Sequence, residues 1–423
     1  MQRGTNLPAL GGYNQAVILD LIRRSGSGLS RVELAGETGL SGQTVSNVTK
    51  RLLEDGIIHE SGKSSTGPGK PRTILQLESR ARVAIGVHLD PSVITYVLVD
   101  LEGAVIGHRR SLTPSPIDPV SAIATVVAAI DALTAEAGID RERVLGVGIA
   151  APGPIDADRG ILIAPPLLVG WDRVSLRDAL IEATGLPVVL EKDVTAAAVA
   201  ELWLQSGPSR DNFAFLYYGT GIGIGLALEH EVLRGASRNA GDAGHIMVAD
   251  DGPLCECGLH GCLGNLVQPK ALVTDAIASG LFDGPEVADE AAAVIGDGSE
   301  LDAARVLLGM ELIAALASRG DPRAGAVLHG VASHIARALV TIVNLLDIDH
   351  VVFGGPFWSP IAAVVLAEMP ELIAKHPALV QPHPVVVTDS ASGDDVTAIG
   401  AACLVLDHTF SPRPAALLIS ATR

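Results

Sequence analysis

Three of the four cysteines in this chain lie within eight consecutive residues, "CECGLHGC", at positions 255–262. A cluster of this density closes one short loop on itself, so it constrains the local fold more than any other feature of the sequence. Two chemistries can close such a loop, a disulfide or a metal centre. The fourth cysteine, Cys403, is far away in the sequence, and we expect it to pack in a terminal helix.

Length and apolar content bound the class of protein. With 423 residues the chain exceeds one ordinary core, which predicts two or three domains. No apolar run reaches the roughly 18 residues that a bilayer span needs, and the first residues lack the apolar segment of a signal peptide. We therefore predict a cytoplasmic protein without a membrane partner. In that reducing compartment, clustered cysteines favour metal ligation or catalysis over disulfides.

Charge is distributed unevenly along the chain. Residues 1–80 contain ten Lys and Arg against seven Asp and Glu, whereas residues 81–423 contain 20 basic against 41 acidic side chains. The long acidic part repels a polyanion. If nucleic acid is a partner, it must therefore contact the first 80 residues.

The first 80 residues predict three short helices followed by two strands. Apolar residues at helical spacing form the first helix, which stops at "SGSG". Ser30 and Glu33 form a capping box for a second helix, which ends at Gly39. Ser41 caps a third, and "GIIHE" and "RTILQL" follow as strands joined by a Gly-, Ser- and Lys-rich wing. This order predicts a winged helix-turn-helix.

The third helix and the wing carry side chains suited to DNA. Outward groups on such a helix hydrogen-bond base edges or neutralise phosphates, and a basic wing contacts the backbone or minor groove. The candidate residues are Gln43, Thr44, Asn47, Lys50 and Arg51 on the helix, and Lys63, Lys70 and Arg72 in the wing. The alternative is a helical interaction domain whose polar third helix is only solvated. The charge distribution and the wing favour DNA binding.

After Glu78 the pattern changes to apolar strands alternating with helices, which predicts α/β sheets in two halves. In this part, "GTGIGIG", "EKDVTAAAVAE", "GDAGH", "CECGLHGC", "VVFGG" and "TAIGAA" resemble, in order and spacing, the motifs of the ROK family. That family comprises sugar kinases with an actin-like ATPase fold and transcription repressors built from the same fold.

The resemblance implies a division of the chain into two domains. Residues 1–80 would form the winged helix-turn-helix and residues 81–423 a two-lobed ROK domain. Its small lobe would comprise about 81–195 with the C-terminal helix at about 395–410. Its large lobe, about 196–394, would contain the metal site.

The resemblance also bears on the cysteine cluster, because a histidine separated by nine intervening residues from Cys-x-Cys-x4-Cys fits the zinc sites of the family. One imidazole and three thiolates form a closed tetrahedral shell, so we expect a structural zinc ion. Its ligands would be His245, Cys255, Cys257 and Cys262, with Gly258 and Gly261 allowing a tight loop. A Cys-x-Cys disulfide would be strained and leave one thiol over. Unligated core cysteines are the remaining alternative.

For a sugar-like ligand, the resemblance implies contacts at Lys192, Asp193, Asp242 and His245. The motif "DAGH" has Asp242 where the family has Glu, and Gly264 replaces a further glutamate. Asp193 stands at the position of the aspartate that in a kinase accepts the proton of the attacking hydroxyl. Lys192, in place of an Asn, has two interpretations: it lowers the basicity of Asp193 and attracts an anionic effector such as a sugar phosphate or sugar acid, or it points to solvent.

The nucleotide end departs most from the family pattern. ROK kinases hold phosphate with an Asp-x-Gly-Gly-Thr turn, whereas this chain has "HLDPS" at His88-Leu89-Asp90-Pro91-Ser92. Asp90 puts a carboxylate near the phosphate position, and Pro91 lacks an N–H donor. Both changes oppose ATP, so we predict no catalytic residue and no kinase activity. We interpret the glycines of "GTGIGIG" as permitting a close approach of strands.

These observations predict a DNA-binding repressor whose ROK domain senses a carbohydrate-like ligand. Operator DNA with two-fold symmetry requires paired reading heads, so a homodimer or homotetramer is expected. The alternative is an ATP-dependent sugar kinase with an accessory DNA-binding domain. A third possibility is a regulator without a small ligand that responds to a protein partner.

Overall fold

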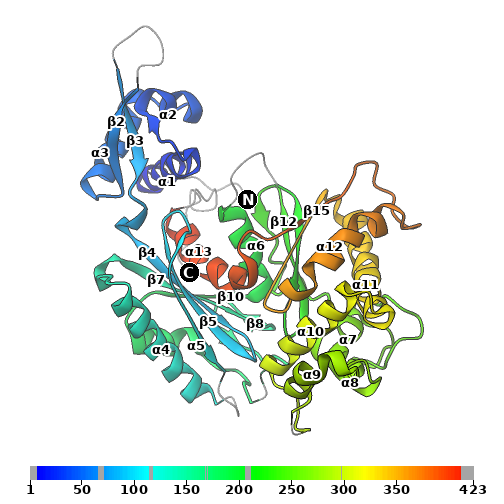
Figure 1. The fold of residues 1–423 in the computed structure, drawn as a ribbon. Coiled ribbons are helices and arrows are strands. Elements are labelled where there is room, and N and C mark those ends of the chain that lie inside the picture. The colour runs from blue at the N-terminus through cyan, green and yellow to red at the C-terminus, as the bar shows by residue number, and fades with distance from the viewer. Residues whose placement is uncertain are drawn as a thin grey trace.

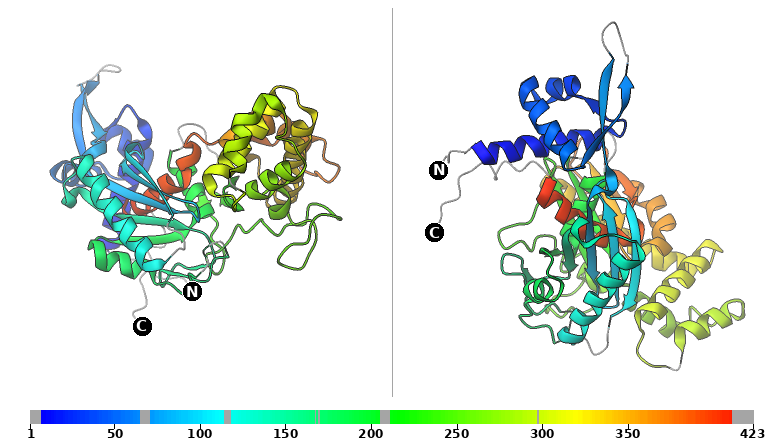
Figure 2. Two further views of the ribbon diagram at one scale, coloured as in Figure 1. Left: turned by 60° about the horizontal axis from the view of Figure 1, so that its bottom comes forward. Right: turned by 90° about the vertical axis from the view of Figure 1, so that its left-hand side faces the viewer.

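The computed structural model describes residues 7–64, 71–113, 118–166, 168, 170–204, 211–296 and 298–410. A small N-terminal head stands on a larger body built around two five-stranded sheets (Figure 1). Two further views show the head projecting beyond the first sheet, and a group of helices on the far side of the second (Figure 2). The expected α/β class with an N-terminal winged head is therefore confirmed.

The head consists of three helices and a three-stranded antiparallel sheet of order β1-β3-β2. Its elements are α1 (Leu7–Ser25), β1 (Leu29–Ser30), α2 (Arg31–Thr38), α3 (Gly42–Glu54), β2 (Ile58–Ser64) and β3 (Arg72–Leu77). The predicted caps are confirmed. Ser30 and Glu33 form a capping box, Gly39 is left-handed with φ 67°, and Ser41 accepts a hydrogen bond from the Thr44 N–H.

The first sheet of the body has the order β10-β7-β4-β5-β6. Its strands are β4 (Val83–Leu89), β5 (Val93–Asp100), β6 (Val105–Leu112), β7 (Val144–Ala151) and β10 (Val188–Lys192). Helices α4 (Pro119–Glu136) and α5 (Leu176–Thr184) pack on one face. Helix α13 (Val396–Phe410) covers the other face, and it contains the buried Cys403, as expected.

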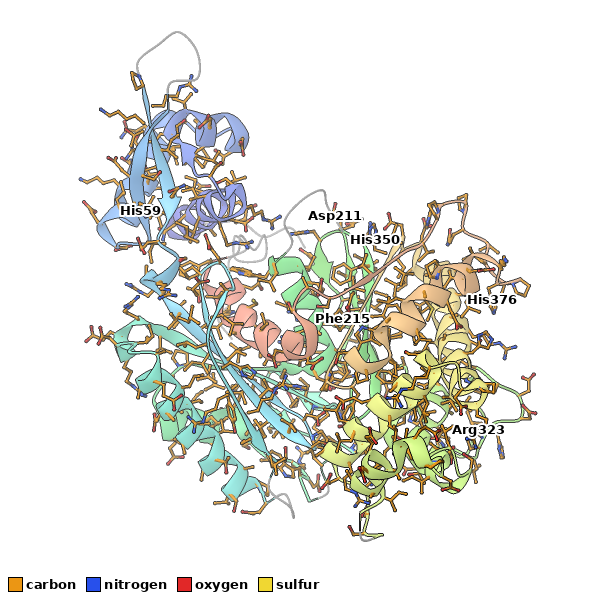
Figure 3. The ribbon with its side chains drawn as sticks, viewed as in Figure 1. His59, Asp211, Phe215, Arg323, His350 and His376 are labelled. Atoms are coloured by element: carbon orange, nitrogen blue, oxygen red, sulfur yellow. The ribbon has the colours of Figure 1, made fainter. Side chains whose placement is uncertain are left out.

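The second sheet has the order β13-β12-β11-β14-β15. Its strands are β11 (Phe213–Tyr218), β12 (Ile222–Leu228), β13 (Glu231–Val232), β14 (His350–Gly354) and β15 (Val386–Asp389). One face packs on α6 (Asp193–Leu204), and the other on a helical layer. Along β11, Phe215 points toward α6 and α13 whereas Leu216 points toward that layer (Figure 3).

The helical layer contains α7 (Leu263–Val267), α8 (Pro269–Ala278), α9 (Ala288–Ile295), α10 (Ala303–Ser318), α11 (Pro322–Leu346) and α12 (Ser359–Ala374). The remaining elements are the short strands β8 (Ile155–Asp156) and β9 (Ile161–Leu162) and the 3₁₀ turns η1 (Ser79–Ala81), η2 (Arg141–Arg143), η3 (Pro285–Val287) and η4 (Gly393–Asp395).

Helices α6 and α13 lie together between the two sheets (Figure 1). Glycines make this packing possible. A Cβ at Gly148 of β7 would overlap the carbonyl oxygen of Ala401, and one at Gly400 would overlap that of Ala196. The backbones therefore pack directly on one another, and α6 has little room to move independently of either sheet.

Two helices correct the prediction that no segment is long and apolar enough for a bilayer span. Both α4 and α11 meet that length and composition, with mean hydropathy 1.4 and 1.5 over 18 residues. Isolated polar residues such as Asp131 and Arg337 interrupt their apolar runs in the sequence. Each packs an apolar face into the folded body: Ile130 of α4 lies against the first sheet, and Leu339 of α11 lies in the core of the helical layer.

The head contacts the body through α1 and the C-terminal end of α6. The Arg23 guanidinium lies 4.0 Å from the centre of the Trp203 ring, and its Nη1 donates to the Trp203 carbonyl oxygen at 2.7 Å. The Arg23 Nη2 also forms an ion pair with the Asp20 Oδ1 at 2.8 Å. Beside this contact, the Arg24 Nη2 lies 2.9 Å from the His230 Nε2. The core of the head and the α6–α13 layer form one continuous apolar cluster.

Candidate functional site

Helix α3 presents the predicted DNA-contacting residues on its outer face. Val45, Val48 and Leu52 are buried against the rest of the head, which turns the intervening polar residues outward. Gln43, Asn47, Lys50 and Arg51 are exposed, and Thr44 is half-buried. The Gln43 Nε2 donates to the Asn47 Oδ1 at 2.9 Å, so these two amides share one exposed edge.

The wing residues lie at the far end of the β2–β3 pair. Lys63 and Arg72 are both exposed, and Lys63 is paired with Thr73 across the two strands. Lys70 lies outside the described residues. The described part of the wing therefore places two cations near the outer end of the head. His59 lies further down β2, where its Nδ1 is 3.3 Å from a carboxylate oxygen of Glu78 (Figure 3).

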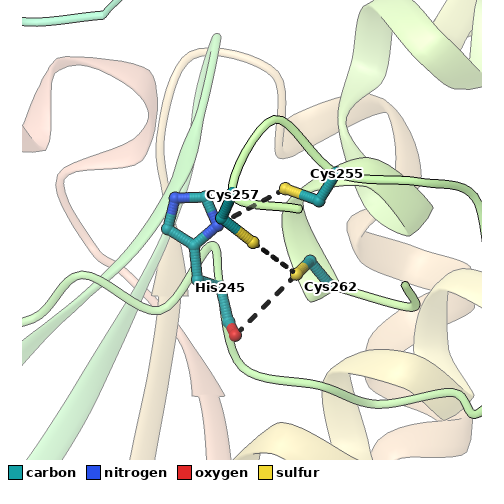
Figure 4. A group of neighbouring side chains, drawn as sticks. All are labelled: His245, Cys255, Cys257 and Cys262. Atoms are coloured by element: carbon teal, nitrogen blue, oxygen red, sulfur yellow. Dashed lines mark hydrogen bonds between the residues drawn. The ribbon is translucent and has the colours of Figure 1, made fainter. Parts of the chain in front are cut away.

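The structure brings His245 and the three clustered cysteines together, with ligand atoms all within 4.8 Å of one another (Figure 4). The His245 Nδ1 lies 3.4 Å from the Cys255 Sγ, and the Cys257 Sγ lies 3.6 Å from the Cys262 Sγ. Gly258 and Gly261 have φ of 86° and 69°, so the loop uses left-handed turns, as expected.

The donor set fits a zinc ion. At usual Zn–S and Zn–N bond lengths, the ligands of a tetrahedral site lie about 3.5–3.8 Å apart, close to the separations found here. Burial and the neighbouring sulfurs raise the pKa of Cys262 to about 12. A bound cation offsets this effect and allows three thiolates to lie together. The observed geometry supports a metal centre and gives no support to a Cys-x-Cys disulfide, since all four cysteines are free thiols.

A cavity of about 420 Å³, called the cleft below, opens where β10 ends and α6 begins. All four predicted ligand-binding residues line it: Lys192, Asp193, Asp242 and His245. The volume suits a small carbohydrate. Because the His245 Nδ1 faces the sulfurs, its Nε2 is the ring nitrogen left for a ligand in the cleft.

Asp193 is the first residue of α6, and its Oδ1 accepts a hydrogen bond from the Val194 N–H at 2.7 Å. Burial raises its pKa to about 6. The Lys192 ammonium and the Val194 N–H oppose this rise, whereas Asp90 and Asp242 add to it. A carboxyl group that changes charge near neutral pH in a cavity of this size is typical of a functional site.

The interpretation that Lys192 points to solvent is wrong. Its exposed fraction is 7%, and its Nζ donates to the carbonyl oxygens of Asn239 and Ala240 at 3.3 Å. The other interpretation holds in part, because the cation does lower the pKa of Asp193, but burial outweighs it. Sequence spacing could not reveal this, since the two carbonyls lie 47 and 48 residues further along the chain.

Residues of "HLDPS" form hydrogen bonds that join the two halves of the body. The Asp90 carboxylate accepts from the Ser92 N–H at 2.8 Å and from the Thr220 hydroxyl at 2.9 and 3.1 Å. Thr220 belongs to "GTGIGIG" between β11 and β12. His88 is buried with its Nε2 3.4 Å from the Tyr217 hydroxyl, and burial lowers its pKa. The carboxylate thus binds the turn that follows β11.

The glycines of β12 do permit a close approach, but the partner is a helix and not a strand as expected. A Cβ at Gly223 would lie 2.6 Å from the Val194 side chain, and one at Gly225 would overlap the Val194 carbonyl oxygen. These glycines let α6 pack directly on β12. The alternating glycines therefore fix the position of Asp193 at the helix start.

Asn239 is a cleft residue that sequence inspection missed. Its side-chain amide accepts from the Ile155 N–H at 2.7 Å and donates to the Ile155 carbonyl oxygen at 2.8 Å. It thereby ties the loop after β13 to β8. It lies in an irregular loop without periodicity, so no sequence signal marks it.

Residues 84–408 match the model of the ROK family. The chain belongs to the ROK family. Residues 17–59 match a winged helix-turn-helix DNA-binding model, which agrees with α1 to β2 of the head. Both domains predicted from the sequence motifs are thus of the expected kind.

Curated relatives of this ROK chain include repressors. It is 28% identical over 264 residues to the xylose repressor of Bacillus subtilis, a match that covers 62% of this chain and 67% of the repressor. It is 23% identical over 407 residues to the DNA-binding transcriptional repressor Mlc of Escherichia coli, with 94% of each chain covered.

Solved structures share the fold. A ROK family transcriptional regulator, a homolog of the E. coli Mlc protein, superposes with a TM-score of 0.74 at 22% identity and covers 95% of this chain and 98% of its own. A ROK family glucokinase from Streptomyces griseus, in complex with glucose and AMPPNP, gives 0.60 at 28% identity and covers 76% of this chain and 98% of its own. The two-lobed kinase-like body is therefore confirmed.

Proposed function

We propose that this ROK chain is a transcriptional repressor that binds operator DNA and responds to a sugar or sugar derivative. The head over residues 1–80 reads DNA, and the ROK domain over 81–423 binds the effector. Because it would act on operator DNA, we expect the protein to be cytoplasmic. Two-fold operators require a homodimer or homotetramer.

The extent of the matches carries this proposal. The repressor Mlc aligns with 94% of this chain, so most of the head is included. The match to the glucokinase structure covers 98% of the glucokinase but only 76% of this chain. What distinguishes the present chain from a ROK kinase is thus a winged head with an exposed polar α3.

Within the head, we assign base contacts to Gln43, Thr44 and Asn47. Lys50, Arg51, Lys63, Lys70 and Arg72 would contact phosphates. The exposed Gln43–Asn47 edge supports the first assignment, because side-chain amides can pair with adenine in the major groove. The second follows from charge, since phosphate contacts supply most of the affinity for any DNA sequence.

In the ROK domain, we assign effector contacts to Lys192, Asp193, Asp242 and His245. The carboxylates would accept hydrogen bonds from sugar hydroxyls. A structural zinc ion on His245, Cys255, Cys257 and Cys262 would hold the histidine ring in place for this contact. When bound, the ion supplies structural cross-linking of the loop, and the cleft side chains carry out recognition.

We propose that the chain has no kinase activity. The Asp90 carboxylate is bound by Thr220 and the Ser92 N–H, so a negative charge already occupies the turn that a triphosphate would approach. The Asp90 carboxylate would repel the negative charge of a triphosphate. The specific observation that keeps a kinase as the second candidate is Asp193 in the cleft, with its pKa raised to about 6 by burial.

The function is tested by selecting genomic fragments that the purified full-length protein binds, followed by footprinting. A discrete, two-fold symmetric site whose affinity changes with one of a panel of sugars supports the proposal. Equal affinity for all fragments contradicts it. ADP release from Mg-ATP in the presence of that panel, abolished by Asp193→Asn, would establish the kinase instead.

A further inference from the structure

A second cavity, of about 440 Å³, lies against β10 and is separate from the cleft. Its charged wall consists of Arg177 at the start of α5, Arg234 and Arg238 in the segment after β13, and Glu191 of β10. We call it the arginine pocket. The part of the chain beyond residue 80 has 41 acidic and only 20 basic side chains, so three converging arginines are unusual there.

Glu191 forms the floor of the arginine pocket. Its exposed fraction is 0%, and its Oε2 accepts from the Arg234 Nε at 2.7 Å and from the Arg238 Nη2 at 3.1 Å. One buried carboxylate therefore balances two guanidinium groups, each of which remains about a third exposed toward the cavity. With Arg177 added, the described lining residues carry an excess of positive charge.

The other side-chain partners of Arg177 and Arg238 are exposed carboxylates. The Arg177 Nε donates to Asp178 at 2.9 Å, and the Arg238 Nη1 to Asp158 at 3.2 Å. The two carboxylates are 61% and 84% exposed, so water screens both pairs and a ligand can replace them. The Arg238 Nε is buried and, among the described residues, has no hydrogen-bond partner.

We propose that the arginine pocket binds a phosphate dianion, either free or carried by a small metabolite. Planar guanidinium groups match the oxygens of phosphate and form charge-assisted hydrogen bonds with them. The volume exceeds that of phosphate alone and leaves space for a group of sugar size. The cleft is a poorer site for the same charge, because Asp90, Asp193 and Asp242 line it against the single cation Lys192.

The position of the pocket links it to the cleft. Glu191 and Lys192 are consecutive on β10, and consecutive side chains of a strand point to opposite faces. The segment that carries Arg234 and Arg238 continues into Asn239 and Ala240, whose carbonyl oxygens hold the Lys192 ammonium. A phosphate that draws on the two arginines would therefore act on a segment that also forms one wall of the cleft.

Calorimetric titration of the full-length protein tests the proposal without DNA, so it is independent of the repressor function. The titrants are glucose 6-phosphate, inorganic phosphate and glucose at constant ionic strength. We expect one phosphate-dependent site per chain. Binding of glucose 6-phosphate tighter than inorganic phosphate identifies a phosphorylated metabolite as the occupant, and the reverse order identifies free phosphate.

Arg177→Gln is the decisive variant, because the Arg177 side chain pairs with exposed Asp178 and a backbone carbonyl rather than with buried Glu191. We expect it to weaken phosphate binding at least about tenfold. Arg109→Gln is the matched control, since Arg109 of β6 is an exposed arginine paired with Glu136 outside the pocket. It should leave binding unchanged. Circular dichroism verifies that each variant is folded.

Three results would overturn the proposal. One is the absence of binding for both phosphate compounds up to about 10 mM. The second is binding that Arg177→Gln leaves intact and Lys192→Gln removes, which places the anion in the cleft. The third is binding that only Lys63→Gln removes, which places it on the DNA-binding head.

Discussion

At the scale of single residues, the chemistry of this ROK chain depends on how each ionisable group is surrounded. Asp193, Lys192 and His88 are neighbours of the same cleft or its edge, yet burial acts on them in opposite directions. It raises the pKa of the carboxyl group and lowers that of the imidazole, because burial disfavours the charged form of each. The Lys192 ammonium donates to two backbone carbonyl oxygens.

Asp193→Asn is expected to stabilise the protein above pH 6. The folded-state pKa of about 6 lies above the usual aspartate pKa of 3.8, so the folded chain holds this proton more tightly than the unfolded chain. The stabilising contribution is complete below the unfolded-state value and is lost as pH rises to 6. Allowing for solvent screening, the loss is about 2 kcal/mol.

Urea unfolding of the wild type and the variant at pH 5 and pH 8 measures this effect. The variant should gain free energy of unfolding relative to wild type at pH 8 and about half as much at pH 5, because pH 5 lies between the unfolded-state and folded-state pKa values. A variant less stable than wild type at pH 8 would show that the charged carboxylate contributes favourable contacts that outweigh burial.

Asn47→Ala and Lys63→Ala should affect DNA binding in different ways. Loss of the amide removes a base contact, so we expect preference for the selected operator over random DNA to fall by about 1–3 kcal/mol. Loss of the ammonium removes a phosphate contact. It should weaken binding to both DNAs and reduce the slope of affinity against salt by about one.

Fluorescence anisotropy at several salt concentrations separates the two effects. Glu37→Ala, an exposed substitution on α2 away from the α3 face, provides the control. A loss of the same size on operator and random DNA for Asn47→Ala, or a loss confined to the operator for Lys63→Ala, would contradict the assigned roles.

At the scale of elements, α6 and the loop over residues 245–262 position the cleft. Glycines of β12 and α13 allow α6 to pack without intervening side chains, which fixes its first residue, Asp193. The loop has two left-handed glycines and few regular hydrogen bonds, with isolated bridges between Met247 and Cys262 and between Leu254 and His260. Such a loop depends on cross-linking for its conformation.

Metal removal should therefore loosen this loop while the sheets stay folded. We expect about one zinc ion per chain by atomic absorption, and faster proteolysis within residues 245–262 after chelation. Cys257→Ser should reproduce both effects, since Cys257 is exposed and its loss costs little packing. Cys403→Ser should retain the metal, and a metal-free wild type purified without chelator would refute the zinc assignment.

At the scale of the whole molecule, one helix connects the cleft to the head. Helix α6 begins at Asp193 in the cleft and ends at Leu204, next to the Arg23–Trp203 contact. A rigid helix of this length transmits a displacement of its first turn to its last. The Arg23 Nε and the Trp203 Nε1 are buried without hydrogen-bond partners among the described residues, so this contact is not fully satisfied.

Arg23→Ala should uncouple the head from the body. Removing the guanidinium abolishes the contact with the Trp203 ring and its carbonyl oxygen. We expect faster hydrogen exchange in α1 and the last turn of α6, with no change in the loop over residues 245–262. Arg51→Ala, on the same head but facing outward, is the control. Unchanged exchange in α1 would mean that apolar packing alone holds the head.

Local features of this protein could be predicted from the sequence. The capping box at Ser30 and Glu33, the apolar face of α3 and the cysteine loop all rely on groups within about 20 residues of one another. These local interactions require fixed spacings between residue types, and such spacings are visible in the sequence. The order of strands and helices and the family motifs likewise identified the body.

Other features were decided only by tertiary structure. The environment of Lys192, the helix that packs on the β12 glycines, and the meeting of Arg177, Arg234 and Arg238 over Glu191 all join segments distant in sequence. Which groups become neighbours there depends on how two sheets and two central helices stack, and no local periodicity records it. Burial and long-range charge then set the pKa of Asp193. The sequence by itself thus determined which chemical groups this protein has, and packing decided which of them act together.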